Sequence, residues 1–117
     1  MLAGGRAEST GGTQAGEIRF RVIGSAYATS TIAGLHRDIA GQLAGLLDCR
    51  RKAFRRERDA HGSVEVAVSV RDGALQHARP RSQLRASAPQ CVARWLERLD
   101  GDGLGDADLE LAISFAP

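Results

Sequence analysis

The clearest chemical candidates are Cys49 and Cys91, the only two cysteines among 117 residues. Each lies at the border of the apolar stripe of a predicted helix, and two helices on one sheet touch along such borders. A disulfide can form between them if their Cα atoms come within about 7 Å. The alternative is two free thiols, buried as small apolar side chains in a reducing compartment. Spacing alone leaves both interpretations open.

A run of positive charge follows the first cysteine. This basic cluster consists of Arg50, Arg51, Lys52, Arg55, Arg56 and Arg58. It could bind the phosphates of a nucleic acid, but aromatic side chains for base stacking are scarce. Tyr27 alone is left for stacking, because the other aromatic residues fit core positions. We therefore keep nucleic-acid binding as an alternative function.

An acidic loop, DGDGLGDADLE at residues 100–110, invites comparison with a calcium-binding loop. The glycine that an EF-hand requires at its sixth position is present as Gly105. However, Leu104 and Leu111 stand at the fifth and twelfth positions, where oxygen ligands are required. A polar connector is the better interpretation, and we predict no metal site here.

The remaining residues show no catalytic pattern. His36, His61 and His77 have no zinc-ligand spacing with one another or with the cysteines. Neither cysteine has the local signature of a nucleophile. The sequence also has no phosphate loop, nucleophile elbow or pair of acid–base carboxylates. We predict that the protein is not an enzyme and has no cofactor.

Length and composition indicate one globular domain with little net charge. The chain is 43% hydrophobic and 26% charged, and 16 Lys and Arg against 14 Asp and Glu give a net charge of +2. It has no apolar run of about 18 residues, so we expect no membrane insertion by this chain. The glycine-rich start predicts a disordered lead-in or linker over residues 1–16 and a folded domain over residues 17–117.

Three segments alternate apolar and polar residues, as half-buried strands do. They cover residues 17–23, 64–71 and 109–115. After the second strand, Asp72 and Gly73 favour a two-residue hairpin turn. The return strand covers residues 74–79, and Pro80 ends it or marks it as an edge.

Two segments, residues 31–58 and 88–99, have helical spacing. In the first, Gly34, Gly41 and Gly45 fall on the face opposite the apolar stripe, toward water. Arg50 falls at the centre of the stripe, so its side chain must either extend its guanidinium to the surface or lie beyond the packed part of the helix.

The order of these elements is strand, helix, strand, strand, helix, strand, and each has one apolar face. A two-layer α+β sandwich buries all of these faces together. We predict two helices packed on one face of a mostly antiparallel sheet of three to four strands.

The motifs and their order resemble a known family. A helix ending at Cys49 precedes the valine strand and turn GSVEVAVSVRDG, and a second helix, APQCVARWLERL, carries Cys91. A closing strand ends at Phe115. Over about residues 17–116 the chain resembles the AgmX/PglI carboxy-terminal domain, which is related to the TonB and TolA carboxy-terminal domains of Gram-negative envelope proteins.

Two positions depart from the family pattern. Arg50 stands where an aromatic residue is usual, and Leu96 stands where proline usually follows the tryptophan. The resemblance implies a periplasmic domain with a disulfide between Cys49 and Cys91, as the C-terminal part of a larger anchored protein. Members of the family bind protein partners in energy-transducing and gliding-motility assemblies, and they are not enzymes.

Our leading hypothesis is a non-enzymatic protein-interaction module of the bacterial cell envelope. A partner segment would pair with an edge strand of the sheet through backbone hydrogen bonds. The candidate edges are the strands at 17–23 and 109–115, and their partner-binding residues are Arg19, Arg21, Glu110, Ala112 and Ser114. The alternatives are a cytosolic nucleic-acid-binding domain that uses the basic cluster, and a small regulatory module that binds a ligand or forms a homodimer.

Overall fold

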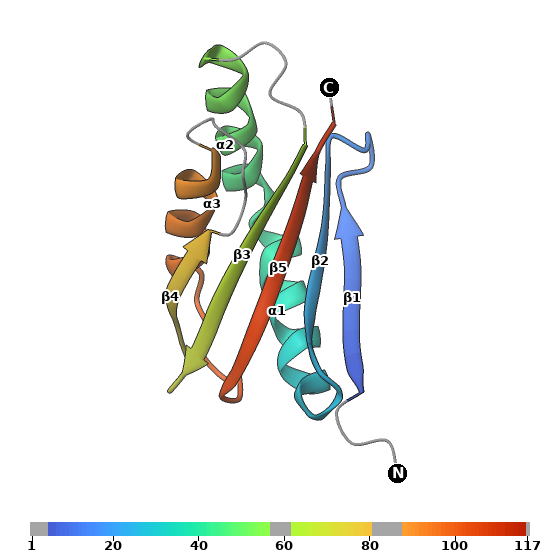
Figure 1. Ribbon diagram of the computed structural model, residues 1–117, viewed down its shortest axis with the longest axis vertical. Helices are drawn as coiled ribbons and strands as arrows, with labels where there is room; N and C mark the ends of the chain where they lie inside the picture. Colours follow the sequence, from blue (N-terminus) through green and yellow to red (C-terminus); the bar gives the residue numbers. More distant parts are fainter. Residues whose placement is uncertain (1–4, 57–61, 81–87, 117) are drawn as a thin grey trace.

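The computed structural model describes residues 5–56, 62–80 and 88–116, and these residues form one sheet and three helices (Figure 1). The strands are β1 (Arg6–Gly12), β2 (Ile18–Ser25), β3 (Gly62–Arg71), β4 (Ala74–Pro80) and β5 (Ala107–Phe115). A 3-10 turn, η1 (Ala26–Ala28), leads into α1 (Thr29–Gly41), and the other helices are α2 (Leu43–Arg56) and α3 (Ala88–Glu97). The β3–β4 turn at Asp72 and Gly73 has positive φ at both residues, which confirms the predicted hairpin.

The five strands form one sheet in the order β1-β2-β5-β3-β4, and every neighbouring pair is antiparallel. The three helices pack on one face of the sheet, and the described residues leave its other face open (Figure 1). The predicted α+β sandwich is confirmed, but the sheet has five strands where we expected three to four. The last strand in sequence, β5, is the central one.

The additional strand is β1, which lies within the predicted disordered lead-in. That prediction is wrong for residues 6–12. The residues of β1 that face the helix layer are small, namely Ala7, Ser9 and Gly11, so the strand lacks the apolar alternation that identifies half-buried strands. Backbone hydrogen bonds to β2 hold β1 in the sheet instead. Backbone hydrogen bonds do not depend on side-chain type, so the sequence pattern does not reveal them.

The core lies between the sheet and the helices, and it confirms the apolar faces predicted for the strands. The buried strand residues are Ile18, Phe20, Val22, Val64, Val66, Val68, Val70, Leu75, Leu109, Leu111, Ile113 and Phe115. The helices contribute Ile32, Leu35, Ile39, Leu46, Cys49, Val92, Ala93 and Leu96. Of the large apolar side chains in the described ranges, Tyr27 alone is exposed.

The single helix predicted over residues 31–58 is two helices. α1 ends at Gly41 and α2 begins at Leu43, because Gln42 leaves the helical conformation with φ −126° and ψ 26°. The Gln42 carbonyl accepts a hydrogen bond of 3.2 Å from Trp95 Nε1 on α3. The break between α1 and α2 is therefore linked to α3.

Two glycines that we expected to face water are packed against other segments. A Cβ at Gly45 would meet the indole ring of Trp95, and a Cβ at Gly34 would meet the side chain of Leu104. The expected exposure is wrong for both, because each glycine allows another segment to approach the helix backbone. Gly41 has open space at this position, as predicted.

Candidate functional site

The two cysteines form a disulfide that joins α2 to α3. The Cα atoms of Cys49 and Cys91 are 5.6 Å apart, and the residues are separated by 42 positions in sequence. Cys49 is buried and Cys91 is half-buried. Of the two interpretations that spacing left open, the structure contains the disulfide. Structural disulfides persist mainly in oxidising, extracytoplasmic compartments.

Arg50 reaches out of the apolar stripe of α2, as we predicted. Its Nε and Nη2 both donate to the backbone carbonyl oxygen of Ala116, at 3.2 and 2.9 Å. The guanidinium thus connects α2 to the residue that follows β5. Arg50 supports the fold and is not part of an open cationic surface.

The other residues of the basic cluster have different surroundings. Arg51 and Lys52 each contact a carboxylate oxygen of Asp48, at 3.7 and 3.2 Å. Arg55 is exposed near the end of α2. The side chain of Arg56 and the whole of Arg58 lie outside the described residues. The exposed cations among the described members of the cluster are therefore Arg51, Lys52 and Arg55, and Asp48 offsets part of their charge.

The strands that we expected at the edges of the sheet lie inside it. β2 pairs with β1 and β5, and β5 pairs with β2 and β3. The residues affected by this correction are Arg19, Arg21, Glu110, Ala112 and Ser114. The apolar pattern of a strand does not encode its place in the sheet, and β1 was not recognised as a strand. These side chains lie instead on the open face of the sheet.

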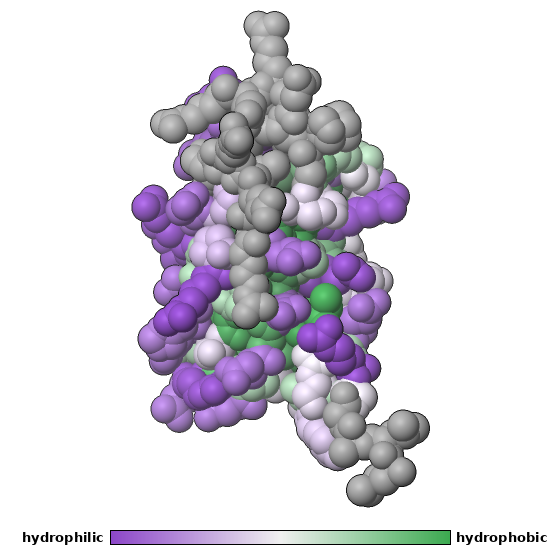
Figure 2. All heavy atoms as spheres, in the orientation of Figure 1, coloured by the Kyte–Doolittle hydropathy of each residue, from purple (hydrophilic) through white to green (hydrophobic). Residues whose placement is uncertain are grey.

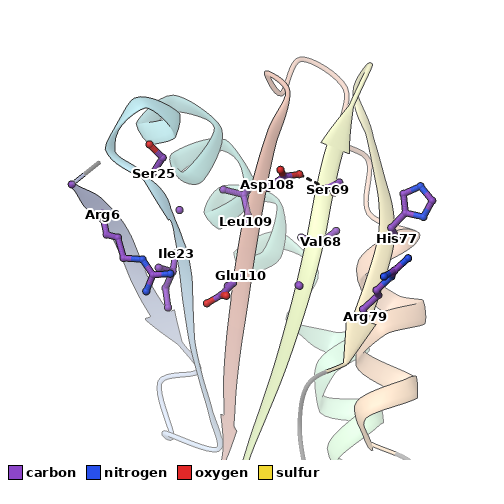
Figure 3. Close-up of a pocket in the computed structure, with 13 residues that line it drawn as sticks. Arg6, Ile23, Ser25, Val68, Ser69, His77, Arg79, Asp108, Leu109 and Glu110 are labelled. Carbon is purple, nitrogen blue, oxygen red and sulfur yellow. Dashed lines mark hydrogen bonds between the residues drawn. The ribbon is translucent and has the colours of Figure 1, made fainter. Parts of the chain in front are cut away.

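The open face is hollowed at both ends. The two hollows have volumes of about 710 and 610 Å³. The larger one extends across the sheet from Arg6 on β1 to His77 and Arg79 on β4 (Figure 3). Figure 2 shows polar side chains along both sides of this face and a more apolar strip between them. The face is therefore mixed in character and carries no single charge.

Among the described residues, ion pairs connect neighbouring strands on the open face at Arg71–Asp108 and Arg21–Glu8. Arg71 Nη2 on β3 lies 2.9 Å from Asp108 Oδ1 on β5, which also accepts a 2.9 Å hydrogen bond from Ser69 Oγ. The Ser69 hydrogen bond and the Arg71 guanidinium lower the pKa of Asp108 below its usual value of 3.8. Arg21 on β2 lies 3.8 Å from Glu8 on β1. Both pairs are exposed, so each stabilises the fold only slightly.

The carboxylates of the acidic loop act as local hydrogen-bond acceptors. Asp100 Oδ1 accepts from the backbone N–H of Asp102, and Asp106 Oδ1 accepts from the backbone N–H of Asp72. Partial burial and the charge of Asp100 raise the pKa of Asp38 on α1. Within the described ranges, no group of three or more His, Cys, Asp or Glu side chains is placed to hold a metal ion.

The true edges of the sheet are β1 and β4, and β4 is the protected one. Its register against β3 shifts by one residue between Gln76 and Arg79, which is a β-bulge, and His77 within the bulge has φ 55°. Pro80 at the end of the strand has no N–H to donate. A helix packs against each edge strand, α3 against β4 and α1 against β1, so the helices do not distinguish the two edges. Bulges and prolines do, because both hinder the pairing of an edge strand with another chain.

The β1 edge is regular over its whole length. Its register with β2 has no shift across seven residue pairs, and its sequence RAESTGG contains neither proline nor lysine. Hydrogen bonds just beyond its two ends continue this register. The Ala26 N–H donates to the Gly5 carbonyl at 2.7 Å, and the Thr13 N–H donates to the Ile18 carbonyl at 3.0 Å.

These two hydrogen bonds fix the direction of every backbone group in β1. Hydrogen-bonded and non-hydrogen-bonded pairs alternate along an antiparallel ladder. Because Gly5 and Thr13 bond toward β2, the odd-numbered residues between them do so as well. The residues that direct their backbone groups away from β2 are Arg6, Glu8, Thr10 and Gly12. Among the described residues no strand lies on that side, so these groups form a row open to a partner.

Close contacts with α1 and β2 hold β1 in place. Ser9 Oγ lies 2.6 Å from His36 Nδ1 on α1, and the imidazole centroid lies 5.1 Å from the ring centroid of Phe20. A Cβ at Gly11 would lie 2.7 Å from Phe20 Cζ and 2.8 Å from His36 Cε1. A larger residue at Gly11 would therefore displace the strand. The edge is preformed.

The β1 edge was not predicted from the sequence, although one weak signal for it exists. The longer polar residues of RAESTGG alternate with small ones, which is the pattern of a strand with one face packed closely. Without a large apolar residue, the same letters have the composition of a linker.

No protein-family model matches the sequence, and no curated protein matches it either. None of the helices in the described ranges is both long and apolar enough to span a membrane. We therefore infer the function from the β1 edge, the disulfide and the distribution of charge.

Proposed function

We propose that this domain is a non-enzymatic protein-interaction module that adds an extended partner segment to its sheet beside β1. The observation that carries this proposal is the row of outward backbone groups on a regular, unprotected edge strand. In strand addition, such groups supply affinity, and the side chains at alternate positions supply specificity.

The packing of β1 supports this proposal, because the strand is ordered before a partner arrives. The Ser9–His36 hydrogen bond and the close fit at Gly11 hold its inner side. A preformed edge lowers the entropy cost of binding. Arg6 and Glu8 are exposed on the open face, where they can contact charged side chains of the added strand.

The disulfide and the resemblance to AgmX/PglI domains both support a location in the cell envelope. Disulfides persist in the bacterial periplasm, which is an oxidising compartment. We place the domain there as part of a larger anchored protein, in an assembly of the energy-transducing or gliding-motility type. The disulfide would keep the helix layer rigid when the partner transmits force.

Amide hydrogen exchange, followed residue by residue by NMR, tests the proposal. In the free protein, the N–H groups of Ala7, Ser9 and Gly11 should exchange slowly and those of Glu8 and Thr10 rapidly. A synthetic peptide of alternating threonine and valine serves as the probe. Its binding should slow exchange at Glu8 and Thr10. Protection along β4 alone, or along neither edge, would contradict the proposal.

Two substitutions at Thr10 form a matched pair. Thr10→Pro removes an outward N–H without the loss of a hydrogen bond to β2. We expect this variant to lose protection by the peptide at Glu8, whereas Thr10→Ala should keep it. Circular dichroism would check that both variants are folded. Protection that appears without peptide and rises with protein concentration would identify the partner strand as a second copy of this chain.

A further inference from the structure

A groove of about 510 Å³ lies along α2 and α3, beside the disulfide. The two helices contact each other directly, and the Cys49–Cys91 bond fixes them together. The groove belongs to the helix layer, whereas β1 offers its backbone groups at the edge of the sheet. A ligand here would therefore not compete for the β1 edge.

Positive charge is concentrated on the two helices that form this groove. Together α2 and α3 contain six Lys and Arg and two Asp and Glu, although the whole chain contains 16 and 14. Lys52, Arg94 and Arg98 line the groove, against the single carboxylate of Asp48. The groove therefore has an excess of cations that the chain as a whole does not have.

Two of these cations are available to an incoming anion. Arg94 and Arg98 are exposed, lie four residues apart across the end of α3, and form no ion pair with any described residue. Lys52 is in a different situation, because its Nζ lies 3.2 Å from Asp48 Oδ2. Asp48 is thus a carboxylate of the groove that already pairs with Lys52. It would compete with the carboxylate of a bound peptide for this ammonium group.

The aromatic residue in the groove is poorly suited to base stacking. Trp95 is half-buried, donates Nε1–H to the Gln42 carbonyl, and packs against the backbone at Gly45. Exposed Tyr27 precedes α1, whereas α2 follows the opposite end of α1. Nucleic-acid binding without sequence readout relies on stacked bases as well as phosphate contacts, and the described groove offers mainly the latter.

We propose that this groove binds an acidic peptide segment of a protein partner, at a site separate from β1. Guanidinium groups form paired hydrogen bonds to carboxylates, and two such groups line this groove, Arg94 on α3 and Arg98 just after its end. The disulfide holds the helices at a fixed spacing, so the cations are arranged before the ligand arrives.

Fluorescence of Trp95 provides a direct readout, because it is the only tryptophan in the chain. The probe is an oligoglutamate peptide, titrated into the disulfide-intact protein at low salt. We expect a saturable change in Trp95 emission that disappears at about 0.5 M salt, where the screening length is only a few ångströms. An oligothymidylate of the same net charge is titrated in parallel.

Two variants of groove residues and one control variant test the proposed site. Arg94→Gln combined with Arg98→Gln should weaken oligoglutamate binding about tenfold, since two exposed charge contacts are lost. Asp48→Asn should tighten binding about threefold, because it removes the competing carboxylate. The control, Arg19→Gln combined with Arg79→Gln, removes the same charge from the open face of the sheet and should leave binding unchanged.

Several results would overturn the proposal. One is that the Arg94 and Arg98 double variant binds oligoglutamate as tightly as the unmodified chain, and another is that the control weakens binding equally. Tighter binding of oligothymidylate, with the same dependence on Arg94 and Arg98, would identify the ligand as nucleic acid. The β1 experiment follows amide exchange at other residues, so either proposal can fail while the other holds.

Discussion

The two edge strands of the sheet have the same length, but one is regular and the other is irregular. β1 and β4 are both seven residues long. β4 has a bulge at His77 and a terminal proline, whereas β1 has a continuous register and an outward row of backbone groups. Selection against aggregation alone would protect both edges. The difference therefore supports the proposal that a partner strand pairs with β1.

The helices also differ between the β4 side and the β1 side of the sheet. On the β4 side, α3 is covalently joined to α2 through Cys49–Cys91. On the β1 side, α1 contacts the strand through the Ser9–His36 hydrogen bond and close packing. The protected side of the molecule is thus cross-linked, and the open side is held by local, non-covalent contacts.

The largest expected effect comes from removal of the disulfide. Cys49→Ser combined with Cys91→Ser should lower the free energy of unfolding by about 4 kcal/mol, the chain-entropy value for a loop of this length. Urea denaturation at equilibrium measures the change. We also expect amides of β4 to lose more protection than amides of β1, since α3 contacts β4. Equal losses at both edges would show that the two sides are not independent.

A smaller effect is expected from a matched pair of glycine substitutions. Gly45→Ala forces the Trp95 ring to move and should destabilise the fold by roughly 1–2 kcal/mol. Gly41→Ala meets no neighbour and should stabilise the helix by up to about 1 kcal/mol. Thermal unfolding of the two variants distinguishes these opposite signs. A gain for Gly45→Ala would mean that α2 and α3 are less closely packed than described.

Deletion of the bulge residue His77 would remove one difference between the β1 and β4 edges, namely the irregular register of β4. Deletion of His77 would restore a continuous β3–β4 register and should let the threonine–valine peptide protect β4 as well as β1. His77→Gly keeps the bulge and only relieves its positive φ, so it should stabilise the fold by up to about 1 kcal/mol and leave β4 closed. Hydrogen exchange compares the two variants. A β4 that stays closed after the deletion would show that the bulge is not what protects it.

The smallest effects are expected from the two ion pairs described on the open face of the sheet, Arg71–Asp108 and Arg21–Glu8. The pKa of Asp108 is lowered in the folded state, so its interactions with Ser69 and Arg71 stabilise the fold at neutral pH and lose their effect as pH falls below about 3.8. Asp108→Asn should therefore lower Tm slightly at pH 7 and leave it nearly unchanged in acid. Glu8→Gln, at the Arg21 pair, is the matched test on the β1 side. Added salt should reduce both differences.

Features encoded by side chains were predictable from the sequence. The alternating strands, the Asp72–Gly73 turn and the border positions of the cysteines all depend on residue type and periodicity. The α+β layer arrangement follows from these faces together. Arg50 was also placed correctly, because a charge at the centre of an apolar stripe has to reach a polar partner.

Features that depend on backbone hydrogen bonds or on contacts between distant segments were not predictable. β1 is held by its backbone, the order of the strands is independent of their apolar pattern, and the helix break at Gln42 is linked to Trp95 on another helix. Gly34 and Gly45 were expected to face water because the apolar stripe of a single helix does not show which other segments pack against its remaining faces. The edge residues of the candidate site were misplaced for the same reason.

The central position of β5 has a consequence for how the domain assembles. β1–β2 and β3–β4 can each form as a local hairpin, but they join through β5, the last of the five described strands in sequence. Any intermediate that lacks β5 exposes the inner sides of both hairpins as unpaired strands, which is a state prone to aggregation. Pairing of β5 with both hairpins therefore covers two strand edges, on β2 and β3, that lie inside the folded sheet.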